Sequence, residues 1–118
     1  MNVIIRPSML EEVKAILEEQ NCGGMTVSTV MGCGTQHGTP EASSEEETVK
    51  EIQGLKTTIN LLPKIRVQFV VTDDKVEPVI QALREKLATG HVGDGKIFVN
   101  PIEEVVRIRT GERDEKAL

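Results

Sequence analysis

One stretch of this sequence combines residue types that suit the binding of an anion. It covers residues 89–99 and reads Thr-Gly-His-Val-Gly-Asp-Gly-Lys-Ile-Phe-Val. Backbone N–H groups in a glycine-rich turn can converge on an anion because no Cβ blocks the approach. Lys96 adds a positive charge at the edge of that turn. The stretch predicts a phosphate cradle, although a helix C-cap followed by a tight turn would use the same residues.

The spacing of Gly90, Gly95 and Lys96 matches half of a Walker A motif, but the other half is absent. Position 97 is Ile where that motif has a metal-binding Ser or Thr, and the next residues favour a strand rather than a helix. Asp94 is the nearest acid, and in a Gly-Asp-Gly turn we expect it to support the loop rather than to activate water. We therefore expect a phosphate cradle of another architecture, in a protein that is not an enzyme.

Two strand–helix–strand units would position this loop. Alternating or β-branched residues predict strands over 3–5, 25–31, 65–71 and 97–99. Two helices are predicted by apolar residues at helical spacing, namely Met9, Leu10, Val13, Ile16 and Leu17 in the first and Val76, Val79, Ile80, Leu83 and Leu87 in the second.

Local signals mark the helix starts and the chain after the fourth strand. Ser8 and Glu11 have the spacing of a capping box. Asp73 and Asp74 suit the cap of the second helix, if Pro78 falls within its first turn. Residues 105–109 read as a last extended piece that carries two arginines on one side.

This order predicts an α+β fold: a ferredoxin-like double βαβ sandwich with both helices on one face of the sheet. The chain of 118 residues is one domain. We expect apolar side chains on the other sheet face as well, which favours a homo-oligomer that covers them. Residues 35–61 lack strand character and are acidic, so we expect a long, mobile and functional loop there. Residues 111–118 form a charged tail.

Composition excludes several classes of partner. The net charge of −5 argues against nucleic acid, whose phosphates require a basic surface. No apolar run reaches membrane-spanning length and no signal peptide is recognisable, so we expect a cytoplasmic protein without membrane insertion. Cys22 and Cys33 have no metal-ligand spacing and are expected to be free thiols.

Two blocks of the sequence together resemble the PII nitrogen-signalling family. The first is residues 89–99, and the second is residues 106–112, which read Val-Arg-Ile-Arg-Thr-Gly-Glu. Shorter matches lie at 4–7, 24–27 and 62–64, so the resemblance covers nearly the whole chain.

The resemblance implies a homotrimer that binds ATP or ADP in the clefts between neighbouring subunits. With Mg²⁺, bound ATP would permit the binding of 2-oxoglutarate, and these ligands would set the shape of the long loop, the T-loop. That loop would regulate a target protein such as an ammonium transporter or a nitrogen-metabolism enzyme. The resemblance thus implies a non-catalytic sensor of nitrogen and energy status.

The family's functional positions carry over to named residues of this chain. Arg107 and Arg109 would complete a phosphate clamp across the subunit boundary. The whole implied nucleotide-binding set is Thr26, Gly32, Gly34, Thr35, Gln36, Val70, Gly90, Gly93, Asp94, Gly95, Lys96, Arg107 and Arg109. The implied 2-oxoglutarate contacts are Arg6, Gln36 and Lys64, and Gln36 would also ligate Mg²⁺.

Departures from the family pattern leave alternatives open. The chain has no Tyr, so the uridylylation known in some members is chemically impossible here. Thr35 stands where many members place an Arg or another residue that faces the phosphates, and the long loop is unusually acidic. One alternative is a PII-like sensor of another adenine nucleotide or a small anion, acting on a metabolic enzyme. Another is a trimeric scaffold with a vestigial cleft, which the intact cradle and arginines argue against.

Overall fold

The strands and helices follow one another in the predicted order. The computed structural model describes residues 1–33 and 61–118. In chain order the strands and α-helices are β1 (Asn2–Ile5), α1 (Leu10–Glu19), β2 (Thr26–Cys33), β3 (Leu61–Gln68), α3 (Asp73–Leu87) and β4 (Lys96–Phe98). Short 3-10 helices, η1 (Pro7–Met9) and η2 (Asp114–Ala117), precede α1 and end the chain.

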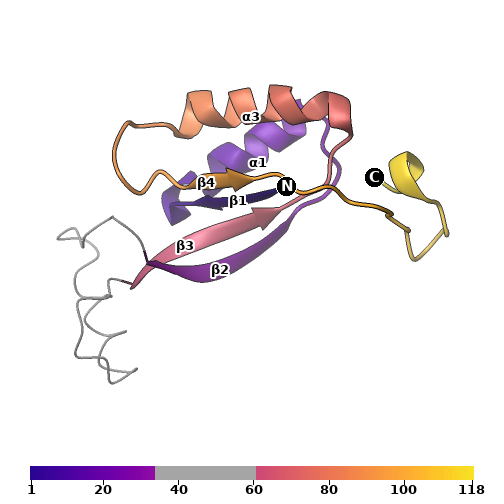
Figure 1. Cartoon of the computed structure of the whole chain (residues 1–118), viewed down its shortest axis with the longest axis horizontal. Helices are drawn as coiled ribbons and strands as arrows, with labels where there is room; N and C mark the ends of the chain where they lie inside the picture. Colours follow the sequence, from indigo (N-terminus) through magenta and orange to yellow (C-terminus); the bar gives the residue numbers. More distant parts are fainter. Residues whose placement is uncertain (34–60) are drawn as a thin grey trace, which may run out of the picture.

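The four strands form one sheet in the order β2-β3-β1-β4, in which every neighbouring pair is antiparallel. The register places Val3 opposite both Val67 of β3 and Ile97 of β4. Both α-helices lie on the same side of the sheet (Figure 1). The predicted α+β double βαβ arrangement is therefore confirmed, while the trimer stays a prediction.

The core lies between the sheet and the two helices. The helical stripes supply its upper layer: Val13, Ile16 and Leu17 of α1 and Val79, Leu83 and Leu87 of α3 are buried. Val3, Ile5 and Val67 are buried beneath them. These aliphatic side chains supply most of the stabilising hydrophobic burial, as the spacing of the apolar residues predicts.

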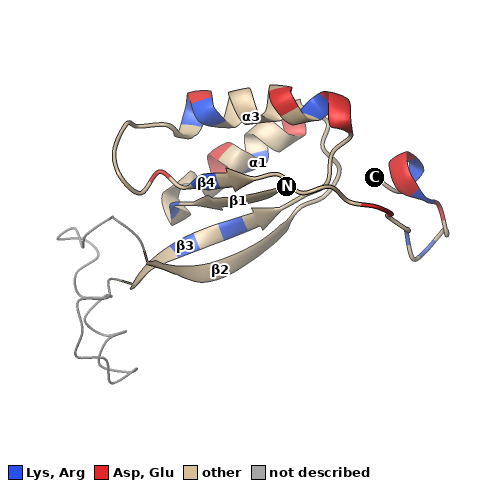
Figure 2. Ribbon diagram, in the orientation of Figure 1, with Lys and Arg blue, Asp and Glu red and all other residues tan. Residues whose placement is uncertain are grey.

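The opposite face of the sheet is mixed rather than apolar. Ile4 lies in register with Arg66 and Lys96, and Val30 lies opposite Lys64, so these residues share that face. Phe98 is two residues further along β4 and is 48 % exposed. Figure 2 shows basic residues on β3, whereas the acidic residues lie mainly on the helices and the C-terminal segment. The apolar side chains expected on this face are thus interspersed with three cations, Lys64, Arg66 and Lys96.

Both helix starts differ from the predicted caps. Pro7 opens a 3-10 turn, so α1 begins only at Leu10, and its N-cap is Met9 without a side-chain hydrogen bond. The capping box predicted at Ser8 is therefore wrong, because Ser8 is already inside that turn. At α3 the N-cap is Thr72, and Asp73 is the first helical residue, so the acids complement the helix dipole instead of capping it.

Pro78 lies in the second turn of α3, although a proline is expected to be tolerated only within the first turn. A proline there removes the N–H that would bond the carbonyl of Asp74. Both residues are exposed, so water can satisfy that carbonyl. Val79 and Leu83 are buried on the other face of the helix, and their packing stabilises α3 despite the missing hydrogen bond.

The third strand begins and ends earlier than predicted. β3 covers Leu61–Gln68 and includes Pro63, which lies opposite Met31 of β2. The pairing of β3 with β1 extends only from Gln68 to Ile65. Pro63 therefore lies beyond the end of β1, where a missing N–H costs no ladder bond on that side.

Only the first part of the predicted extended piece at 105–109 pairs with another segment, because the chain turns at residues 108–110. The N–H of Arg107 donates to the carbonyl of Glu112 at 2.9 Å, and the N–H of Gly111 donates to the carbonyl of Arg107 at 2.8 Å. Gly111 has a φ of +74°, which a tight turn tolerates at glycine. The chain turns back here, and an isolated bridge joins Val106 to Arg113. The two arginines thus sit at a turn, not along one side of a strand.

Candidate functional site

The glycine-rich loop between α3 and β4 is built around the carboxylate of Asp94. Its Oδ2 accepts from the N–H groups of Thr89 at 2.8 Å and Gly90 at 3.2 Å. Its Oδ1 accepts from the Thr89 hydroxyl at 2.5 Å. Together with the Arg6 guanidinium, these donors hold the pKa of Asp94 well below its usual range. Asp94 is thus ionised at neutral pH and supports the loop, as the sequence predicts.

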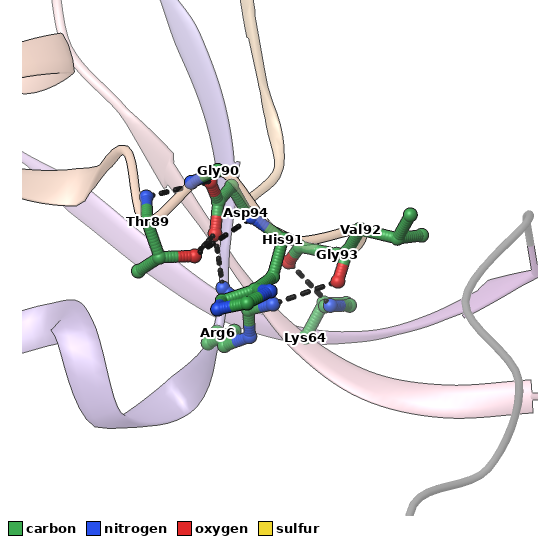
Figure 3. Close-up of polar contacts among 8 residues, drawn as sticks. All are labelled: Arg6, Lys64, Thr89, Gly90, His91, Val92, Gly93 and Asp94. Carbon is green, nitrogen blue, oxygen red and sulfur yellow. Dashed lines mark hydrogen bonds and ion pairs between the residues drawn. The ribbon is translucent and has the colours of Figure 1, made fainter.

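Two cations, one directly after β1 and one on β3, hold the backbone carbonyls of the same loop (Figure 3). Arg6 donates through Nη1 to Asp94 Oδ1 at 2.5 Å and through Nη2 to the carbonyl of Val92 at 2.8 Å. Lys64 donates to the carbonyl of Gly93 at 3.0 Å. Burial, followed by the charge of Arg6, lowers the pKa of Lys64, while Asp94 opposes the shift.

The close packing of this loop on β1 requires glycine at position 95. Gly95 has a φ of +108°, and a Cβ at this residue would lie 1.8 Å from the carbonyl oxygen of Ile4. Lys96 follows at once as the first residue of β4 and pairs with Ile4. Gly95 therefore determines the position of Lys96, the cation of the predicted phosphate cradle.

A cleft of about 420 Å³ opens beside the loop on the face of the sheet away from the helices. It is lined by Gly32, Lys64, Gly93, Gly95 and Lys96, to all of which the family resemblance assigns a role in ligand binding. Ile4, Leu62 and Phe98 provide apolar walls. A cleft with two ammonium groups and apolar walls can hold an anionic ligand that also has an apolar part.

Other predicted site residues lie elsewhere in the chain. Thr26 and Val70 line a second cleft of about 510 Å³ with Met1, Gln68 and Leu118. Because Thr26 and Gly32 are at the two ends of β2, the two clefts lie at opposite ends of that strand. A single chain therefore does not bring all the assigned residues into one pocket.

The two arginines lie on the C-terminal segment, at the end of the molecule opposite to the glycine-rich loop (Figure 1). Arg107 is partly buried and donates to Glu112 Oε1 at 3.3 Å and to the carbonyl of Leu118 at 3.1 Å. Arg109 is exposed in the turn. The loop and the arginines can share a ligand only if they come from different copies of the chain.

Three of the predicted residues, Gly34, Thr35 and Gln36, lie outside the described residues, as does nearly all of the expected T-loop. Within residues 1–33 and 61–118, no group of three or more His, Cys, Asp or Glu side chains could hold a metal ion. In the same two ranges, no helix has both the length and the apolarity needed to cross a bilayer.

Sequence reasoning missed the contacts that organise the loop. The role of Asp94 follows from its glycine neighbours, but its partner Arg6 is 88 residues away, and no local signal in the sequence indicates this contact. The contact between Lys64 and Gly93 spans 29 residues in the same way. Only the register of β1 between β3 and β4 brings these groups together.

Comparisons with known proteins give a consistent result. The family model described as nitrogen regulatory protein P-II matches residues 1–112. The nitrogen regulatory protein P-II 2 of Methanothermobacter thermautotrophicus is 45 % identical over 115 residues, which cover 98 % of this chain and 92 % of that protein. Nitrogen regulatory protein P-II of Mesorhizobium japonicum is 44 % identical, with 95 % and 92 % covered. That of Azospirillum brasilense is 41 % identical, with 100 % and 97 % covered.

Proposed function

Because this chain belongs to the nitrogen regulatory protein P-II family, and is therefore a regulatory protein of the PII type, we propose that it senses ATP and ADP. The nucleotide binds between neighbouring subunits of a homotrimer, and residues 35–61 transmit the bound state to a target protein. The target is an ammonium transporter or a nitrogen-metabolism enzyme in the cytoplasm. The chain itself performs no catalysis.

The observation that carries this proposal is the division of the site within one chain. Lys96 and the glycine-rich loop line one cleft, Thr26 and Val70 line another, and Arg107 and Arg109 lie on the segment beyond. Phosphate binding by guanidinium and ammonium groups is strong when several converge. A second copy of the chain can supply the arginines to the loop of the first, which completes a clamp that one chain lacks.

Exposed apolar side chains support the same assembly. Phe98, Val99, Ile102, Val106 and Ile108 are all exposed, and Ile108 is 98 % accessible. They belong to the continuous stretch that runs from β4 into the C-terminal turn. Single chains rarely leave so much apolar surface in water, and burial between subunits would remove it.

We expect light scattering or sedimentation to give three times the mass of one chain at micromolar concentration. The exposed apolar residues and the divided site both require the assembly. Replacing Ile108 with Arg is expected to weaken the trimer, whereas the same change at Ala15, which is exposed on α1, leaves the mass unchanged. A stable monomer of the wild-type chain at micromolar concentration would refute the proposed assembly.

We further propose that 2-oxoglutarate binds in the cleft only when Mg-ATP is present. Lys64 lines that cleft together with Lys96, so its ammonium can pair with a ligand carboxylate beside the phosphates. Gln36 would ligate the Mg²⁺ that bridges the phosphates and the keto acid.

Titration calorimetry of 2-oxoglutarate into protein loaded with Mg-ATP, with Mg-ADP or with neither tests this. Binding is expected in the first case alone, and Lys64→Ala is expected to weaken it about tenfold or more, because it removes one charge-assisted contact. Arg66→Ala is the matched control, since Arg66 lies on the same sheet face but donates to Ser28. If 2-oxoglutarate gives no binding heat in any of the three cases while ATP still binds, the protein responds to nucleotide alone.

A further inference from the structure

Arg6 connects the end of β1 to the glycine-rich loop. It directly follows Ile5, which is buried in the core at 1 % exposure, so the backbone that carries the guanidinium is fixed. One guanidinium nitrogen contacts the Asp94 carboxylate and the other donates to the Val92 carbonyl (Figure 3). Two acceptors of one loop, on residues two apart, are thus held by one planar group.

Asp94 passes this restraint on to the start of the loop. Both of its oxygens are used: Oδ1 accepts from Arg6 and from the Thr89 hydroxyl, and Oδ2 accepts from the N–H groups of Thr89 and Gly90. The N–H of His91 in turn donates to the Thr89 hydroxyl at 3.2 Å. Residues from Thr89 to Asp94 are thereby tied to the sheet through Arg6.

A loop that is held in its binding conformation loses less conformational entropy when a ligand arrives. This loop contains three glycines with positive φ, at 90, 93 and 95, so without restraint its unbound ensemble would be broad. The network around Asp94 removes that freedom before any phosphate is bound.

We propose that Arg6 is a positioning residue for the nucleotide, which acts through Asp94 and the Val92 carbonyl to hold the glycine-rich loop in its phosphate-binding conformation. This role is distinct from the contact with 2-oxoglutarate that the family resemblance implies for Arg6. It rests on the proposed function, since it presupposes that the loop binds the phosphates of ATP and ADP.

The two roles of Arg6 predict different results in the absence of 2-oxoglutarate. A residue that only contacts the keto acid leaves the affinity for ADP unchanged when neither 2-oxoglutarate nor Mg²⁺ is present. A residue that holds the loop changes that affinity directly. Titration of ADP alone therefore separates them.

The experiment is titration calorimetry of ADP into the assembled wild-type protein and into Arg6→Gln, Arg6→Lys, Asp94→Asn and the double variant Arg6→Gln/Asp94→Asn. We expect Arg6→Gln and Asp94→Asn each to weaken ADP binding about tenfold. The double variant is expected to bind no more than about tenfold more weakly than the wild type, because both changes break one network. Arg6→Lys should recover part of the loss, since an ammonium can reach one of the two acceptors but does not span both.

Arg66→Gln is the charge-matched control, because it removes from the same sheet face a cation whose guanidinium donates to Ser28 of β2. Its ADP affinity is expected to stay within about twofold of the wild type. Amide hydrogen exchange gives a readout without ligand: the Thr89 and Gly90 amides should exchange faster in Arg6→Gln, while the amides of α1 keep their protection.

Three results would overturn the inference, and they are distinguishable. Wild-type affinity for ADP in Arg6→Gln, with the trimer intact, contradicts the positioning role and leaves the proposed function standing. Fully multiplicative losses in the double variant also contradict it, because Arg6 and Asp94 would then act separately. A wild-type protein that binds no ADP overturns the proposed function, and the positioning role with it.

Discussion

Replacing Arg107 and Arg109 together with alanine is expected to weaken the binding of both ATP and ADP by about 10²- to 10⁴-fold. Each substitution would remove a charge-assisted contact between an arginine and a phosphate, which is worth about 1.5–3 kcal/mol. The loss should be similar for the two nucleotides if both arginines contact phosphates that ATP and ADP share. Titration calorimetry with each nucleotide measures the change.

The matched control removes two positive charges from the same segment without touching the proposed clamp. Arg113 forms an exposed ion pair with Glu104, and Lys116 is exposed in η2. Exposed ion pairs contribute little to stability, so Arg113→Ala/Lys116→Ala should bind nucleotide nearly as the wild type does. Equal affinity of the wild type and of the Arg107/Arg109 double variant would show that the arginines are not part of the site.

Gly95→Ala is expected to destabilise the fold and to abolish nucleotide binding. The positive φ of Gly95 would strain an alanine by roughly 1–3 kcal/mol. The overlap of its Cβ with the Ile4 carbonyl adds roughly another 1–3 kcal/mol, because the neighbour is backbone in the centre of the sheet and has little room to move. A backbone movement that relieves this overlap would separate β4 from β1 and displace Lys96 from the cleft.

Gly90→Ala provides the comparison that isolates the overlap. Gly90 also has a positive φ, +82°, but a Cβ there meets nothing within 4 Å. Its alanine variant should lose only about 1–2 kcal/mol of the free energy of unfolding. Urea unfolding of the two variants, each compared with the wild type, measures the difference. Equal loss in both would mean that the close approach of Gly95 to β1 does not matter.

Sequence reasoning predicts the fold because the signals for it are local. The alternation of strand residues and the helical stripes of α1 and α3 determine which faces are buried, and the order of the elements leaves few topologies. It fails where two local signals compete. Pro7 opens a 3-10 turn before the capping box can form, and the turn at Arg107–Gly111 prevails over the β-favouring residues around it.

The site is only partly predictable because it depends on contacts between distant segments. The glycines and Lys96 of the loop are recognisable by type, and Asp94 by its neighbours. Nothing near Arg6 indicates that its guanidinium holds Asp94 and the Val92 carbonyl. Equally, no local pattern shows that the C-terminal segment with Arg107 lies at the opposite end of the molecule from the glycine-rich loop. That fact emerges only once the C-terminal turn is placed beyond the sheet.

The central claim is that one nucleotide is held by the loop of one chain and by the arginines of another. Mixed assembly of two defective chains tests it most directly. Lys96→Ala disables the loop, and Arg107→Ala/Arg109→Ala disables the arginines, so neither chain alone should bind ATP. After the two are unfolded and refolded together at equal amounts, sites with a normal loop and normal arginines reappear only if the two halves come from neighbouring copies.

Calorimetry with ATP on the mixed trimers should then recover about a quarter of the wild-type number of sites, at nearly wild-type affinity, because random mixing places two intact halves together in about one cleft in four. Mixed trimers that bind no ATP, while wild-type chains treated in the same way bind fully, would contradict the account.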